Sequence, residues 1–265
     1  MISEGQSTAI MIRHTFQRNR VSLIWWSVAV MLYTVINVAV YPAFKDSILL
    51  QTQNYPQGLI DAFGLDNLDQ LGPYIYSQVF LMLPLVLAFL PVMMYAGAFA
   101  GAEERGALDV LLTQPVRRRS LVLATFVTAV VNVAIVLMVT AIATWLTVIA
   151  INEELSFGDV MLASWSVLPV TIAVSSIGLL LSTSMRSRGP VLGASIGIIF
   201  LLYLIDVVGK LAPDFEKLRY ITPFRYFNDV FSYDIPIWYY LLLLGVALVL
   251  LVISVRIFER RDIFT

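Results

Sequence analysis

The stretch that decides the fold is Ser120–Asn152, SLVLATFVTAVVNVAIVLMVTAIATWLTVIAIN, in which 33 consecutive residues carry no charge. The hydrocarbon layer of a membrane is about 30 Å thick and an α-helix rises about 1.5 Å per residue, so roughly 20 apolar residues cross it. Inside hydrocarbon every backbone amide must pair within its own segment, which favours a helix. This run therefore predicts a membrane-spanning helix.

Five more runs have the same character, although Asp206 interrupts one of them. None shows the alternating segments of about ten residues that are typical of membrane β-barrels. The predicted fold is an all-α integral membrane protein with one transmembrane domain over residues 1–265. We expect six transmembrane helices, at about 21–41, 74–102, 120–151, 160–184, 189–209 and 235–256.

Composition supports the same class. The chain is 59% hydrophobic and 13% charged, with a mean hydropathy of +0.85, whereas soluble domains are roughly 45–50% apolar and about 25% charged. An ordinary water-soluble enzyme is excluded. A net charge of −1 argues against a nucleic-acid partner. The absence of cysteine and the single histidine, His14, exclude thiolate chemistry and a multi-histidine metal site within one chain.

The basic residues predict the orientation, because cytoplasmic loops carry an excess of Lys and Arg. With the N-terminus inside, 12 of the 17 basic residues fall on the cytoplasmic side. An even number of spans returns the chain to that side, so we expect a multi-pass protein of the cell membrane with both termini cytoplasmic. The 12 residues are Arg13, Arg18, Arg20, Arg105, Arg117, Arg118, Arg119, Arg186, Arg188, Arg256, Arg260 and Arg261.

Residues 3–20 are expected to form an N-terminal amphipathic helix on the inner membrane surface. Ala9, Ile12 and Phe16 recur at helical spacing, while the arginines lie off that stripe and would face acidic lipid. The alternative is a solvated, partly ordered tail.

The segment between the second and third spans, residues 103–119, reads EERGALDVLLTQPVRRR. The two glutamates suit a helix N-terminus, and Pro115 disfavours helix at the residue before it. Leu108, Leu111 and Leu112 form an apolar ridge, and Arg105 and Asp109 share a polar face. A short amphipathic helix is predicted. It either rests on lipid headgroups or docks its ridge into a groove on a cytoplasmic partner.

The pattern from Glu103 to Arg119 resembles the coupling-helix region of ABC transporter permeases of the ABC-2 type exporter class. In that family the stretch has acidic residues, Gly-Thr or Gly-Ala, Leu, two apolar residues and a Pro flanked by basic residues. The six-span layout and the stretch Thr222–Phe227, TPFRYF, are also similar to that family. Ala107 departs from the threonine of many relatives, and we expect it to be tolerated.

The resemblance implies a permease that pairs with a second permease copy, as a homodimer, and with two copies of an ABC ATPase in the membrane lipid. The chain has no G-x-x-x-x-G-K-[ST] phosphate loop, so ATP and Mg would be bound by the partner. The chain itself is expected to hold no cofactor and to be no enzyme. The cargo would be lipophilic or amphipathic. The residues assigned to the ATPase-coupling interface are Glu103, Glu104, Arg105, Gly106, Leu108, Asp109, Leu111, Leu112 and Pro115.

Other residues have weaker assignments. Gly193 and Gly197 form a G-x-x-x-G pair that suits either the dimer seam or packing within one subunit. Pro223, Phe224 and Tyr226 are candidates for an outer gate loop, with a simple aromatic belt as the alternative. Asp206 would pair with Lys210, one turn later, at the membrane boundary.

Two other classes of membrane protein share single features with this sequence. An ion- or proton-coupled secondary transporter usually buries several ionisable residues and contains internal repeats, and here only Asp206 is a candidate. An intramembrane protease with an E-E-x-x-x-R motif would need Arg where the chain has Leu108, and several histidines besides. The first remains as the alternative and the second is rejected.

Overall fold

A computed structural model of the chain describes residues 4–52, 59–60, 65, 67–106, 117–231 and 234–261. Within these ranges the chain forms helices and short turns and no strand, which confirms the all-α prediction. Residues 107–116, which include Leu108, Asp109, Leu111, Leu112 and Pro115, lie outside the described residues.

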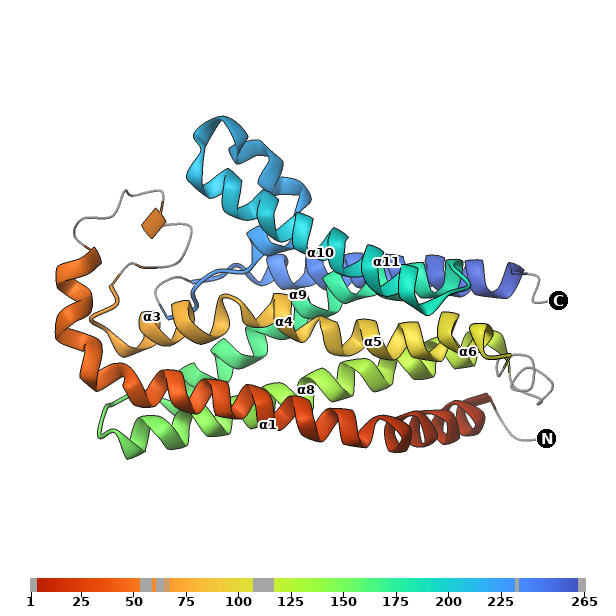
Figure 1. Cartoon of the computed structure of the whole chain (residues 1–265), viewed down its shortest axis with the longest axis horizontal. Coiled ribbons are helices and arrows are strands. Elements are labelled where there is room, and N and C mark those ends of the chain that lie inside the picture. The colour runs from red at the N-terminus through yellow and green to blue at the C-terminus, as the bar shows by residue number, and fades with distance from the viewer. Residues whose placement is uncertain are drawn as a thin grey trace.

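Six helical segments in the described part of the chain are long and apolar enough to cross a membrane, as predicted. They run along the long axis of the molecule, except that the later part of α10 rises away from the other helices (Figure 1). The first is Asn19–Ala43 of α1 and the second is the segmented stretch Leu71–Glu104. The other four are α8 Arg118–Ala150, α9 Phe157–Ser184, α10 Arg188–Leu211 and α11 Ile237–Arg260.

The N-terminal segment is continuous with the first span. Helix α1 runs from Glu4 to Thr52, so the expected helix at 3–20 is not a separate element followed by a break. The reason is local: apart from Gly5, no glycine or proline precedes Pro42 in α1, so nothing in the sequence ends the helix at residue 20. After Pro42 the last turns of α1 leave the direction of the bundle (Figure 1).

The second span is not one regular helix. A five-residue π-helix, η1, occupies Tyr76–Phe80, and residues 81–82 form a turn ahead of Pro84. Proline cannot donate a backbone hydrogen bond, so a break of this kind is expected beside it. The other pieces of the span are α3 Leu71–Ile75, α4 Leu83–Leu87, α5 Phe89–Ala98 and α6 Ala100–Glu104.

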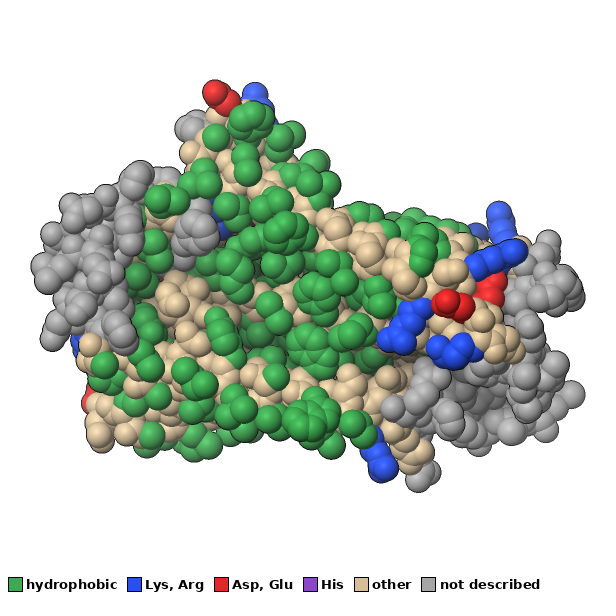
Figure 2. All heavy atoms as spheres, in the orientation of Figure 1, with side chains coloured by type: hydrophobic (Ala, Val, Ile, Leu, Met, Phe, Trp, Pro, Cys, Tyr) green, Lys and Arg blue, Asp and Glu red, His purple; other side chains and the backbone are tan. Residues whose placement is uncertain are grey.

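The interior of the bundle is built from the second span, α8 and α9, whereas α1, α10 and α11 are largely exposed. Many buried hydroxyl groups on α8 and α9 donate to the carbonyl four residues earlier, as Thr140 does to Val136 and Ser176 to Ile172. This pairing satisfies polar side chains where no water is present. Figure 2 shows hydrophobic side chains over the middle of one face and charged groups gathered near its ends.

Gly178 on α9 lies close against α5, because a Cβ built on it would lie 2.8 Å from Cγ2 of Val92. We expect Gly178→Ala to lower the stability by about 1–3 kcal/mol through overpacking. The control is Gly245→Ala, since a Cβ there has no atom within 4 Å in the described structure. The thermal midpoint of the purified protein in detergent should fall for the first variant alone.

Candidate functional site

The predicted coupling segment joins the bundle at the end where α1 begins and α11 ends (Figure 1). On one side α6 ends at Glu104, and Gly106 follows with a φ of +65°. This left-handed conformation suits glycine, and its amide donates to the carbonyl of Glu103 at 2.8 Å. On the other side α8 begins at Arg118. Both attachment points therefore have defined structure.

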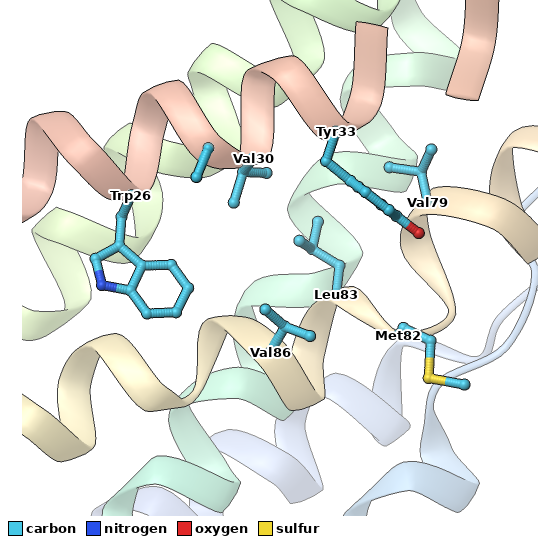
Figure 3. A pocket seen from close by; sticks show the side chains of 8 residues that line it. Trp26, Val30, Tyr33, Val79, Met82, Leu83 and Val86 are labelled. Atoms are coloured by element: carbon cyan, nitrogen blue, oxygen red, sulfur yellow. The ribbon is translucent and has the colours of Figure 1, made fainter. Parts of the chain in front are cut away.

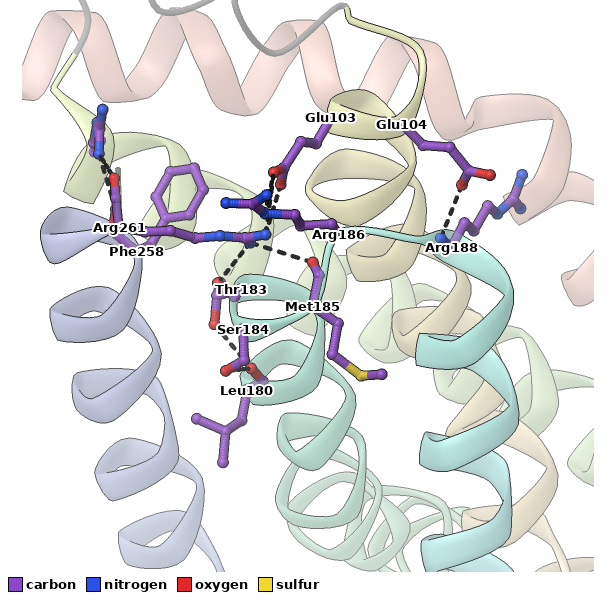
Figure 4. Close-up of polar contacts among 11 residues, drawn as sticks. Glu103, Glu104, Leu180, Thr183, Ser184, Met185, Arg186, Arg188, Phe258 and Arg261 are labelled. Atoms are coloured by element: carbon purple, nitrogen blue, oxygen red, sulfur yellow. Dashed lines mark hydrogen bonds and ion pairs between the residues drawn. The ribbon is translucent and has the colours of Figure 1, made fainter. Parts of the chain in front are cut away.

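Glu103 is held by two arginines, Arg186 in the loop between α9 and α10 and Arg261 directly after α11 (Figure 4). Arg261 Nη2 lies 2.9 Å from its Oε2 and 3.1 Å from its Oε1, and Arg186 Nε lies 3.4 Å from its Oε1. The Glu103 and Arg261 side chains are 16% and 12% exposed, so this pair is largely shielded from solvent, whereas Arg186 is open to it. The pair joins the end of the second span to the end of α11.

Arg261 also reaches the last turn of α9. Its Nη1 donates to the carbonyl oxygens of Thr183 at 3.0 Å and Met185 at 3.2 Å. The last carbonyls of a helix have no partner within the helix, so a guanidinium both satisfies them and favours the negative end of the helix dipole. The pKa of Arg261 is lowered, mainly because the guanidinium is removed from water. The nearby carboxylate of Glu103 opposes this shift, and the positive charge of Arg186 adds to it.

Glu104 contacts the beginning of α10. Its Oε2 accepts a hydrogen bond of 2.9 Å from the backbone amide of Arg188, the first residue of that helix (Figure 4). A carboxylate is favourable at a helix N-terminus, where amides are unpaired and the dipole is positive.

Arg118 ties the other side of the segment to α11. Its Nη1 donates to the carbonyl oxygens of Arg261 at 2.5 Å and Phe258 at 3.4 Å. The Phe258 ring packs edge-on against Phe99, with centroids 5.2 Å apart. We call the ionic groups on both sides of the segment the terminal charge cluster. Its members are Glu103, Glu104, Arg118, Arg186, Arg188 and Arg261.

Of this cluster, the sequence points only to Glu103 and Glu104 as site residues. It predicts them at the partner interface, and the structure brings their carboxylates onto the chain's own helix ends. Arg105 is exposed, with its Nη2 3.5 Å from the carbonyl of Gly97. Arg186 and Arg261 were counted only as orientation signals. Their position directly after spans is a sequence signal that could identify them as site residues. Which carboxylate each arginine contacts depends on how the helices pack.

At the opposite end, the expected ion pair between Asp206 and Lys210 is confirmed, with 3.2 Å between Oδ2 and Nζ. The structure adds Arg219, whose Nε lies 3.0 Å from Oδ1 of the same carboxylate. Asp206 is only 3% exposed, so both cations compensate a buried charge. Arg219 comes from η2, Pro213–Ile221, and the contact holds that segment against α10.

The candidates for the outer gate loop lie next to η2, in η3, which spans Pro223–Tyr226. Phe224 is buried and packs edge-on against Tyr203, with centroids 5.5 Å apart. The Tyr226 hydroxyl donates to the carbonyl of Tyr220 at 3.2 Å. The loop is therefore anchored to α10 through Phe224 and to η2 through Tyr226.

Gly193 and Gly197 lie on the exposed part of α10. A Cβ built on either has no atom within 4 Å in the described structure, so the pair makes no close helix contact there.

The model of the ABC-2 family transporter proteins matches residues 9–263, nearly the whole chain. The chain is a member of the ABC-2 transporter family. No curated protein matches it. Membership makes this ABC-2 protein the permease component of a membrane transport system, and the family implies an ABC ATPase as partner.

Glu103→Gln should leave the guanidinium of Arg261 without its main counter-charge in a poorly solvated position. We expect a loss of about 1.5–3 kcal/mol in stability, the range for hydrogen bonds to charged groups. Glu104→Gln is the matched control, because its exposed side chain makes one hydrogen bond to a backbone amide. Thermal unfolding in detergent measures both, and equal midpoints would contradict the assignment of Glu103 as the principal tie.

Proposed function

We propose that this ABC-2 protein is the permease of an ATP-driven exporter that moves a lipophilic or amphipathic substrate across the cell membrane, with both termini in the cytoplasm. It would act as a homodimer with two ATPase subunits, which bind ATP and Mg. Residues 103–119 would be the lever that the ATPase moves.

The observation that carries this proposal is that residues at both ends of the lever belong to the terminal charge cluster. Glu103, at the start of the segment, is tied through Arg261 to the ends of α9 and α11. Glu104 is tied to α10, and Arg118, near the end of the segment, is tied to the end of α11. A push on residues 107–116 would therefore reach the ends of all these helices at once.

The membrane-facing surface supports a dimer. Only 22% of the apolar window of α10 is buried in the described structure, and its glycines at 193 and 197 are exposed. Small exposed residues allow close approach of helices in lipid. We assign Gly193 and Gly197 to the seam between the two copies, and Pro223, Phe224 and Tyr226 to the outer gate beside it.

The alternative of a secondary transporter gains nothing from the structure. Such carriers use ionisable groups in the membrane that exchange a proton or ion. Asp206, the candidate for that role, meets Lys210 and Arg219 within 3.2 Å and is closed off from solvent. This arrangement suits a structural tie better than an exchange site.

The lever is tested by replacing Leu108, Leu111 and Leu112 with Asp. If the leucine ridge docks into the ATPase, the triple variant loses the ATPase in a pull-down while the permease still purifies as a folded membrane protein. The control is Thr113→Asp, which adds a charge on the polar face and leaves the ridge intact. Continued co-purification of the ATPase with the triple variant would refute the coupling assignment.

Transmission is tested separately with Glu103→Gln in the assembled complex. The ATPase should remain bound, because the ridge is unchanged, but permease-dependent ATP hydrolysis should fall by about fivefold or more, the lower end of ordinary coupling energies. Glu104→Gln should fall less. Hydrolysis equal to wild type in both variants would show that the terminal charge cluster does not transmit the motion.

A further inference from the structure

An apolar groove lies between α1 and the second span. A cavity of about 280 Å³ is lined on one side by Trp26, Ala29 and Tyr33 and on the other by Val79, Met82 and Val86. Figure 3 shows these side chains around an open space between the two ribbons, with the Tyr33 ring extending across from α1. None of the residues that line this cavity is charged.

A second cavity, of about 410 Å³, lies beside the first. Tyr33 and Met82 line both cavities, so the two spaces are neighbours along the same groove. The second cavity adds Ser77 and Gln78 and reaches Leu65, in the segment that follows α1. The groove thus changes along its length from wholly apolar to apolar with uncharged polar groups.

The depth of the groove follows from the span it lies on. Trp26 is seven residues from the start of the span Asn19–Ala43, and Tyr33 is ten residues from its end. At about 1.5 Å per residue, both side chains belong to the middle of the bilayer. The second cavity lies further toward the end of the bundle away from the termini. Ser77 and Gln78 are six and seven residues from the start of the second span at Leu71, so they lie nearer that membrane boundary than Val86 does.

The irregular second span shapes this groove. Its wall is formed by η1 and the turn at residues 81–82, where the regular helix is interrupted. The Tyr33 hydroxyl donates to the carbonyl oxygen of Gln78 in η1, which holds α1 and the second span together at the junction of the two cavities. π-Helical segments of this kind are frequent at functional sites.

Water is a poor occupant of the first cavity, because an apolar cavity offers it almost no hydrogen-bond partners. An ion or a charged headgroup would find no counter-charge there. The groove belongs to the surface of membrane-spanning helices, so the medium around it is hydrocarbon. A chain lying in it contacts side chains on both walls, which yields more dispersion energy than a convex helix surface does.

We propose that this groove is a binding site for one acyl chain of a membrane phospholipid, with the chain between Trp26 and Val86 and the ester region beside Ser77 and Gln78. The proposal rests on the membrane location of the helices and on the two cavities, and it is independent of ATP-driven transport. The bound chain fills the space between α1 and the second span and is distinct from lipid that exchanges freely around the bundle.

The test compares two identical substitutions on α1. Ala29→Phe fills the groove, whereas Ala39→Phe adds the same ring at an exposed position that lines neither cavity. Each protein is stripped of lipid in detergent, titrated with phosphatidylglycerol and examined by native mass spectrometry. Wild type and Ala39→Phe should retain one lipid per chain at low lipid concentration, and Ala29→Phe should lose at least tenfold in retention. Equal retention by all three proteins would overturn the site.

A second measurement on the wild type covers the case in which Ala29→Phe does not fold. A phosphatidylglycerol with a photoreactive group midway along one chain should cross-link mainly to peptides that contain residues 26–33 and 79–86. Cross-links spread evenly over exposed helices such as α11 would show freely exchanging lipid only. No lipid cross-link at residues 26–33 or 79–86 would overturn the site.

Discussion

The structure depends on the requirement that every backbone amide in hydrocarbon be paired within its own segment. Six helices meet it for most of their length, and the exceptions occur at their ends and at the breaks in the second span. At those places other groups of the chain supply the missing partners. Arg261 donates hydrogen bonds at the end of α9, and Arg118 donates to the carbonyl of Arg261 just after α11. The Tyr33 hydroxyl donates to a carbonyl in η1.

The same requirement links stability to function at the terminal charge cluster. Guanidinium groups that satisfy helix ends also bind the carboxylate of Glu103, so the end of the second span is attached to α9 and α11 by ionic contacts. These contacts lie directly beside the segment proposed to receive the force of the ATPase. A tie made of a few strong contacts can hold the helices together in one state and re-form in another, which a continuous apolar interface does less readily.

The two ends of the bundle solve the same problem differently. Near the termini, the charges join elements distant in sequence, such as Glu103 and Arg261. At the opposite end, Asp206, Lys210 and Arg219 lie within 14 residues of one another and hold η2 against α10. The first arrangement connects many helices, whereas the second shapes one loop. The groove between α1 and the second span lies between these ends, where charged groups are absent from its lining and apolar contacts dominate.

The number of spans and the all-α class follow from the sequence alone, because hydrophobic length and the hydrogen-bonding demand of a bilayer leave few alternatives. The pairing of Asp206 with Lys210 follows from it too, since a spacing of four on a helix brings side chains together. The packing of the helices, in contrast, sets which arginine meets Glu103, brings Arg219 to Asp206 and opens a groove beside Tyr33. These contacts join residues far apart in the chain or in an irregular loop, so they follow from how helices pack, which hydrophobic periodicity does not encode. The continuity of α1 through residue 20 was missed for a related reason: a change from polar to apolar composition marks where a membrane begins, and a helix can cross that boundary unbroken.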